Sequence, residues 1–125
     1  MIWQQLVLLA LAGAAGTLAR FGLQGLVQLA AGASFPWGTF VVNIVGCLAF
    51  GVVWGLAQRQ AISAEARTII LVGFMGAFTT FSSFIFESSA MLEQREYLYM
   101  AANLVGQNVI GIAAFLLGLA AGKAV

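Results

Sequence analysis

The sequence predicts an all-α membrane protein in which residues 1–125 form a single four-helix transmembrane domain. Of the 125 residues, 62% are hydrophobic and only 7% are charged, whereas a soluble domain averages about 25% charged residues. Four apolar stretches are each long enough to cross a bilayer, which takes roughly 20 residues of helix. Helices are expected because a membrane barrel needs alternating strands of about ten residues. Membrane lipid is therefore the expected surrounding of the chain.

The four expected spans follow one another through short connections that leave no room for a soluble domain. The first span carries Arg20 as its only charge and the third carries Glu87, whereas the second and fourth carry none. Because the N-terminus lacks the basic region and cleavage site of a signal peptide, we expect the first stretch to be retained as a helix. The spans are expected at about Trp3–Ala30, Trp37–Ala57, Thr68–Leu92 and Tyr97–Gly122.

Positive charge is almost balanced between the two sides of the membrane. With four spans, both termini and the middle loop share one side, which holds Arg59, Arg67 and Lys123, while the other side holds Arg95 and, if it lies near a helix end, Arg20. Because Lys and Arg in short loops set orientation, this chain has almost no preferred direction of insertion. Two copies inserted in opposite directions can then form an antiparallel homodimer.

The composition also excludes several classes of function. A net charge of +1 provides no basic surface for nucleic acid. The single cysteine, Cys47, excludes an internal disulfide and a cysteine-based metal site. Histidine, the commonest metal ligand and general base, does not occur in the chain. We therefore predict that the protein is not an enzyme.

The third span combines a weakened helix with polar groups. Gly73 and Gly76 weaken the helix just before Thr79 and Thr80, and non-helical backbone inside a membrane occurs where it is buried in protein or lines a cavity. We expect a break near the middle of this span. The carbonyl oxygens of Gly76 and Thr79, freed by such a break, are suitable ligands for a hard cation.

Hydroxyl groups and phenyl rings form two rows on this span. Thr80, Ser83 and Glu87 share one helix face at spacings of three and seven residues. Three phenylalanines recur at steps of three, and the positive edge of a phenyl ring attracts an anion only weakly. Conduction requires sites that bind without trapping the ion, although core packing is the alternative for any single ring. The row consists of Phe78, Phe81 and Phe84.

Amides occupy the second and fourth spans. Asn43 either forms a hydrogen bond between helices or donates to an anion. On the fourth span Asn103 and Gln107 share a face, with Asn108 turned about 100° away, and we expect at least one of the three to line a pathway. Arg20 either extends to an interface or lends positive potential to an anion entrance.

Two pairs of glycines spaced for close helix approach are Gly51/Gly55 and Gly118/Gly122. Either pair can lie at a contact between subunits. The alternative is that they reflect only the high glycine content of membrane helices.

The chain resembles the Fluc (CrcB) family of small fluoride channels over essentially its whole length. The resemblance rests on GTLAR at the first-span arginine, PWGTFVVNIVG in the second span, and GFMGAFTTFSSF followed by Glu87. It implies a passive, fluoride-selective channel of the cell inner membrane that exports fluoride and lowers its cytoplasmic concentration. It also implies a dual-topology, antiparallel homodimer with two pores.

The resemblance further implies roles for individual residues. A structural sodium ion at the subunit interface would be held by the backbone carbonyls of Gly76 and Thr79 from both subunits. Phe81 and Phe84 would present ring edges to fluoride, and Asn43 would be the pore asparagine.

Two features depart from the family pattern. Ala77 stands where many members have a second glycine, which restricts φ and leaves the geometry of the break open. On the fourth span, alignment favours either Asn108 or the pair Asn103 and Gln107, and we choose Asn108. The predicted ion pathway therefore comprises Asn43, Phe81, Phe84, Thr80, Ser83, Asn108 and Arg20.

Two other classes of protein remain open. A small antiparallel multidrug or guanidinium carrier also has four short helices, but it needs a membrane-embedded carboxylate, typically midway along the first helix. This chain offers only Glu87, near the end of the third span. A non-transporting assembly subunit would leave liposomes impermeable to every ion.

Overall fold

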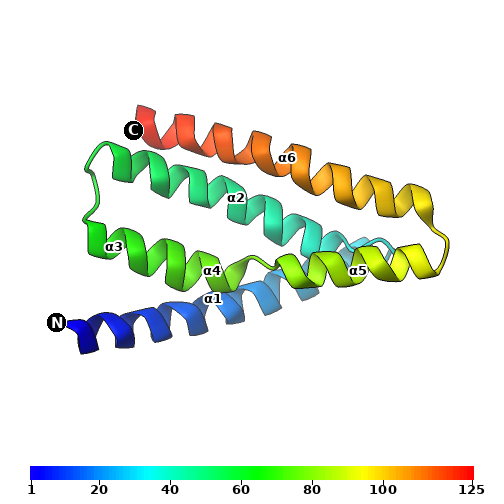
Figure 1. Ribbon diagram of the computed structural model, residues 1–125, viewed down its shortest axis with the longest axis horizontal. Helices are drawn as coiled ribbons and strands as arrows, with labels where there is room; N and C mark the ends of the chain where they lie inside the picture. Colours follow the sequence, from blue (N-terminus) through cyan, green and yellow to red (C-terminus); the bar gives the residue numbers. More distant parts are fainter.

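The computed structural model describes residues 1–125 as helices joined by short connections, and it confirms the four predicted spans. Each span is long and apolar enough to cross a membrane. The helices run along one long axis, with both termini and the connection between the second and third spans at the same end (Figure 1). The spans are α1 (Ile2–Ala31), α2 (Trp37–Gln58), the segmented third span (Ala64–Glu93) and α6 (Tyr97–Ala124).

The third span consists of four helical segments. It begins four residues earlier than predicted because Ser63 caps it, with Ser63 Oγ accepting a hydrogen bond from the Ala66 N–H at 3.1 Å. The segments are α3 (Ala64–Thr68), the π-helical η1 (Ile69–Met75), α4 (Gly76–Phe78) and α5 (Phe81–Glu93).

The predicted break in the third span is confirmed, and it lies between α4 and α5 (Figure 1). Thr79 has φ −86° and ψ 158°, and Thr80 has φ −147° and ψ 106°. Both residues are therefore extended. Ala77 lies within the helical segment α4, so its restricted φ is compatible with the break.

The four paired glycines bring α2 and α6 into close contact within one chain. A Cβ added at Gly51 or Gly55 would collide with the backbone of α6, and one added at Gly118 or Gly122 would collide with the backbone of α2. The two pairs therefore face each other inside the subunit. The alternative of a subunit contact at these glycines is wrong, because their close-packed faces are already occupied.

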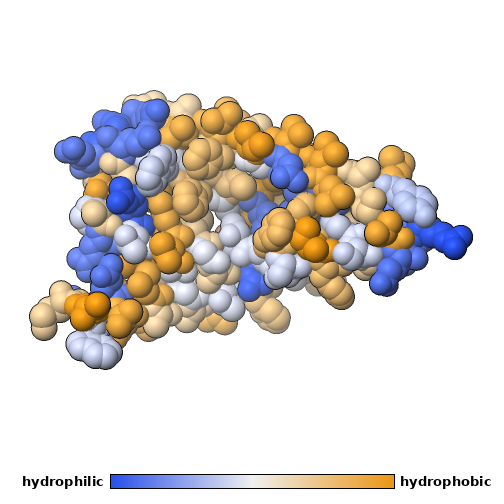
Figure 2. Space-filling view, viewed as in Figure 1, coloured by the Kyte–Doolittle hydropathy of each residue, from blue (hydrophilic) through white to orange (hydrophobic).

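The helix α1 packs against the third span through small residues. A Cβ at Gly16 would collide with the Phe74 carbonyl oxygen, and one at Gly73 would lie 2.9 Å from Ala12 Cβ. Only 23 of the 125 residues are buried. Figure 2 shows mainly hydrophobic side chains along the flanks and hydrophilic groups gathered toward the two ends, as expected for a surface that faces lipid.

Candidate functional site

The Asn43 side chain, on α2, satisfies the backbone at the helix break. The Thr80 N–H donates to Asn43 Oδ1 at 2.9 Å, and Asn43 Nδ2 donates to the Thr80 carbonyl oxygen at 3.1 Å. Asn43 Nδ2 also donates to Gln107 Oε1 on α6 at 2.8 Å. Both hydrogens and the oxygen of this amide are thus engaged in hydrogen bonds within the protein. The contact between helices, which is one of the two roles predicted for Asn43, is therefore present in the structure.

Thr80 begins α5 as its N-cap. Thr80 Oγ1 accepts from the Ser83 N–H at 3.3 Å and donates to Ser83 Oγ at 3.0 Å. In a continuous helix the Ser83 N–H would bond the Thr79 carbonyl, and the Thr80 N–H would bond the Gly76 carbonyl. Both N–H groups donate to side chains instead. The carbonyls of Gly76 and Thr79 therefore lack their helical donors.

Arg20 contacts the break from α1. Its Nε donates to the Ala77 carbonyl oxygen at 3.0 Å, and the side chain is half-buried. The guanidinium thus bonds the last turn of α4, just before the chain becomes extended. It does not line the pocket described next.

A pocket of about 310 Å³ lies beside the break, between α2, α5 and α6. It contains five of the seven predicted pathway residues, namely Asn43, Thr80, Phe81, Phe84 and Asn108. The rings of Phe81 and Phe84 have centroids 5.8 Å apart and planes inclined by 59°. Phe84 is 5% exposed, whereas Phe81 is 74% exposed, so the pocket reaches the surface of the single chain. The other lining residues are Gly46, Cys47, Phe50, Thr79, Gln107 and Phe115.

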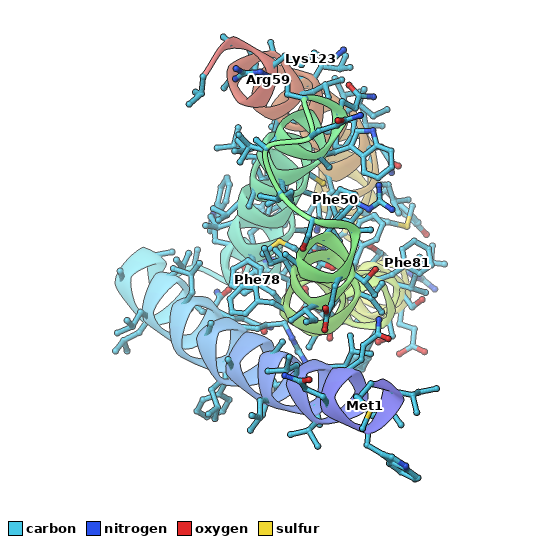
Figure 3. All side chains as sticks on the ribbon, turned by 90° about the vertical axis from the view of Figure 1, so that its left-hand side faces the viewer. Met1, Phe50, Arg59, Phe78, Phe81 and Lys123 are labelled. Carbon is cyan, nitrogen blue, oxygen red and sulfur yellow. The ribbon has the colours of Figure 1, made fainter.

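Phe78 does not belong to the ring row, and this part of the prediction is wrong. Phe78 is 5% exposed and stacks on Phe74 in the core, with ring centroids 5.7 Å apart. Figure 3 shows Phe78 directed toward α1 and Phe81 on the opposite side of the third span. The extended residues between α4 and α5 change the helical phase, so a three-residue spacing across them does not define one face.

Glu87 belongs to a second, polar pocket of about 480 Å³. Thr39 Oγ1 donates to Glu87 Oε1 at 2.7 Å and accepts from Gln24 Nε2 at 2.9 Å. Thr80 lines the first pocket, Glu87 lines the second and Ser83 lines neither of these two, so the three polar groups predicted to share one helix face do not line one cavity. Sequence reasoning missed Gln24 and Thr39. The amides Gln24 and Gln28, one helical turn apart in an apolar span, were the available signal.

The three amides of α6 divide between the interior and the pocket. Asn103 is fully buried and Gln107 is 8% exposed, and Gln107 Nε2 donates to Asn103 Oδ1 at 2.9 Å. Asn108 is exposed, and its Nδ2 donates to the Leu104 carbonyl oxygen at 2.7 Å. Gln107 and Asn108 both line the first pocket, so each of the two alignments places a residue there.

These features define a small multi-pass membrane protein whose polar groups gather around an interrupted helix. No group of three or more His, Cys, Asp or Glu side chains comes together anywhere in the structure. Residues 7–119 match the model of the family described as CrcB-like protein, Camphor Resistance (CrcB). The chain belongs to this family, which confirms the resemblance found from its motifs.

The chain is also similar to several proteins named fluoride-specific ion channel FluC. It is 56% identical to that of Nitrosococcus oceani over 118 residues, which cover 94% of each chain. It is 56% identical to that of Solidesulfovibrio magneticus over 121 residues, covering 96% of this chain and 97% of the relative. Identity to the Thermus thermophilus protein is 40%, over 97% of each chain. The relatives are named as channels, so the prediction of a non-enzymatic protein is confirmed at the level of the family.

Proposed function

We propose that this chain forms a passive channel that is selective for fluoride, exports it across the cell inner membrane and lowers its cytoplasmic concentration. The supporting observation is the pocket in which the rings of Phe81 and Phe84 lie beside hydroxyl and amide groups. Ring edges and neutral donors attract a small anion without a fixed cation that would trap it. The channel names of the relatives support fluoride as that anion.

The amides of α6 are the donors best placed for an anion in this pocket. Asn43 uses both of its amide hydrogens within the protein. Gln107 and Asn108 each use one, which leaves one N–H on each side chain for a ligand. Fluoride would then exchange part of its hydration for these two N–H groups and the neighbouring ring edges.

The proposed assembly is an antiparallel homodimer with two pores. A single chain leaves the pocket open at Phe81, which is 74% exposed, and at the exposed Asn108. Exposing polar groups to hydrocarbon is energetically unfavourable. We therefore expect a second copy of the chain to cover the open side of the pocket. Arg59, Arg67 and Lys123 lie toward one end and Arg95 toward the other, while Arg20 bonds the break between them. With so few positive charges the bias in orientation is small, which is compatible with opposed insertion. Two copies related by twofold symmetry then contain two equivalent pores.

A structural sodium ion fits the two carbonyls of Gly76 and Thr79, which lack helical donors. Oxygen ligands from unwound backbone are typical of sodium sites inside membrane proteins. Gly76 is exposed, and an atom added at its Cβ position would meet only Leu71 O, at 3.8 Å. A second copy can therefore bring its own two carbonyls to the same ion, which would supply positive charge between the subunits. Replacing sodium by N-methylglucammonium should then lower the thermal stability of the dimer, and unchanged stability would oppose this part of the proposal.

A requirement for charge compensation distinguishes a passive fluoride channel from electroneutral fluoride transport. Liposomes loaded with potassium fluoride and containing the purified protein are diluted into fluoride-free buffer, and a fluoride electrode records the efflux. A passive anion channel releases fluoride only after valinomycin allows potassium to follow. Release without valinomycin would indicate electroneutral fluoride transport, and no release in either condition would favour the cation carrier or the assembly subunit.

A further inference from the structure

A series of side-chain hydrogen bonds connects α5, α6 and α2 to the helix break. Ser88 Oγ donates to the Phe84 carbonyl oxygen at 2.7 Å and accepts from Asn103 Nδ2 at 2.9 Å. Gln107 Nε2 donates to Asn103 Oδ1 at 2.9 Å, and Asn43 Nδ2 donates to Gln107 Oε1 at 2.8 Å. We call this series the amide relay; it consists of Ser88, Asn103, Gln107 and Asn43.

The direction of the amide relay is fixed by backbone groups at both ends. The Phe84 carbonyl can only accept, so Ser88 donates to it and uses its lone pairs for the next amide. At the other end the Thr80 N–H can only donate, so Asn43 turns its oxygen toward Thr80 and its nitrogen toward α6. Turning over any one amide would place donor against donor or acceptor against acceptor. Each amide in the relay therefore has a single favourable orientation.

Burial makes this orientation costly to change. Ser88 is 5% exposed, Asn103 is fully buried and Gln107 is 8% exposed. Water has little access to replace a lost partner there, and an unpaired polar group in a region of low dielectric is strongly unfavourable. Ser88 and Asn103 also lie outside the lining of the pocket. Any effect they have on an ion in the pocket must therefore pass through their neighbours, which are the other relay residues and Phe84, whose carbonyl accepts from Ser88.

We propose that Ser88, Asn103 and Gln107 are positioning residues that fix the orientation of the Asn43 amide. Asn43 in turn holds both the N–H and the carbonyl of Thr80, which keeps the chain extended at the break. This inference rests on the proposed channel function. It adds a role for Gln107 beyond donating to the anion, and it assigns Asn103 and Ser88 a function although neither contacts the pocket.

The experiment compares three relay variants with a matched control. Ser88→Ala, Asn103→Leu and Gln107→Met each remove one set of hydrogen bonds, and Gln58→Met makes the same change as the third at an exposed position at the end of α2. Each relay variant should lower valinomycin-dependent fluoride efflux about tenfold, the change expected for the loss of one buried hydrogen bond. The control should conduct like the original chain. Ser88→Ala is the variant most secure in folding, because alanine is a good helix former.

Two further readouts separate positioning from packing. Deuterium exchange of the Thr80 N–H should become faster in all three relay variants. The Asn43 side chain is then no longer held in one orientation, so it accepts from the Thr80 N–H for a smaller fraction of the time. In a double-mutant cycle, Asn103→Leu should lower the flux little further once Gln107→Met has already broken the relay.

The outcomes distinguish the relay from the channel itself. If the original chain releases no fluoride, the proposed function fails, while Thr80 exchange still tests the relay. If the original chain conducts and all three variants conduct with unchanged Thr80 exchange, the relay is overturned and the channel stands. Fully additive effects of Asn103→Leu and Gln107→Met would also overturn it, because independent packing defects add.

Discussion

Gly46 on α2 faces the helix break. A Cβ added there would collide with Thr79 Cγ2 and would lie 3.5 Å from Phe78 Cδ2. Gly46 also lines the pocket beside the break. The substitution Gly46→Ala therefore places one methyl group against the extended residues without removing any polar contact.

The loss of stability expected for Gly46→Ala depends on a hydrogen bond that fixes the Thr79 side chain. Thr79 Oγ1 donates to the Met75 carbonyl oxygen at 3.0 Å, so the methyl group cannot rotate away without breaking that hydrogen bond. Overpacking of a well-packed site costs roughly 1–3 kcal/mol. Alanine recovers at most about 1 kcal/mol through its higher helix propensity than glycine. We therefore expect a net destabilisation of up to about 2 kcal/mol and a fall in fluoride flux, because Thr79, which would be displaced, also lines the pocket.

The assay uses thermal unfolding in detergent together with fluoride efflux from liposomes. The control is Gly22→Ala on α1, where an added Cβ meets nothing within 4 Å. We expect Gly22→Ala to leave the flux unchanged and the unfolding temperature unchanged or slightly raised, because alanine has the higher helix propensity. If Gly46→Ala also behaves like the original chain, Thr79 is free to move. The hydrogen bond from Thr79 to the Met75 carbonyl then does not hold the break in position.

Three further predictions concern the pockets and the amide at the break. Replacing Phe81 or Phe84 by isoleucine should reduce fluoride efflux roughly fivefold with the dimer intact on size exclusion, because one ring-edge interaction is worth about 1 kcal/mol. Normal efflux in both variants would show that the ring edges do not act on fluoride. Asn43→Asp should block fluoride efflux and lower the unfolding temperature, because a carboxylate oxygen would then face the carbonyl oxygens of Thr80 and Gln107, which can only accept. A variant that conducts and is stable would show that the Asn43 amide is dispensable. Glu87→Gln should still conduct, because Glu87 lines a different pocket from the phenyl rings, whereas loss of all transport would favour the proton-coupled carrier.

Much of the architecture could be predicted because hydrophobic length depends only on local sequence. The four spans lie within a few residues of their expected bounds, except that the third begins at Ala64 because of the cap at Ser63. The break could also be predicted, since two glycines precede two residues that favour an extended backbone. Most of the pocket followed from the same segment, because Thr80, Phe81 and Phe84 all lie directly after the break.

The remaining features depend on how the helices face one another. The spacing of Gly118 and Gly122 predicts a close approach but does not say which helix approaches, and here it is α2 of the same chain. The phase change at the break moved Phe78 into the core, which a regular helical period cannot predict. The hydrogen bond from Asn43 to Gln107 joins residues far apart in the sequence, and nothing local to either one indicates its partner.

The proposed function requires the pocket beside the break to conduct fluoride and to discriminate against other halides. The most direct measurement is a comparison of fluoride and chloride efflux from the same preparation of liposomes, with valinomycin present in both cases. We expect rapid fluoride efflux while chloride remains inside the liposomes. Equal release of both anions would contradict selectivity, and retention of both would contradict the channel.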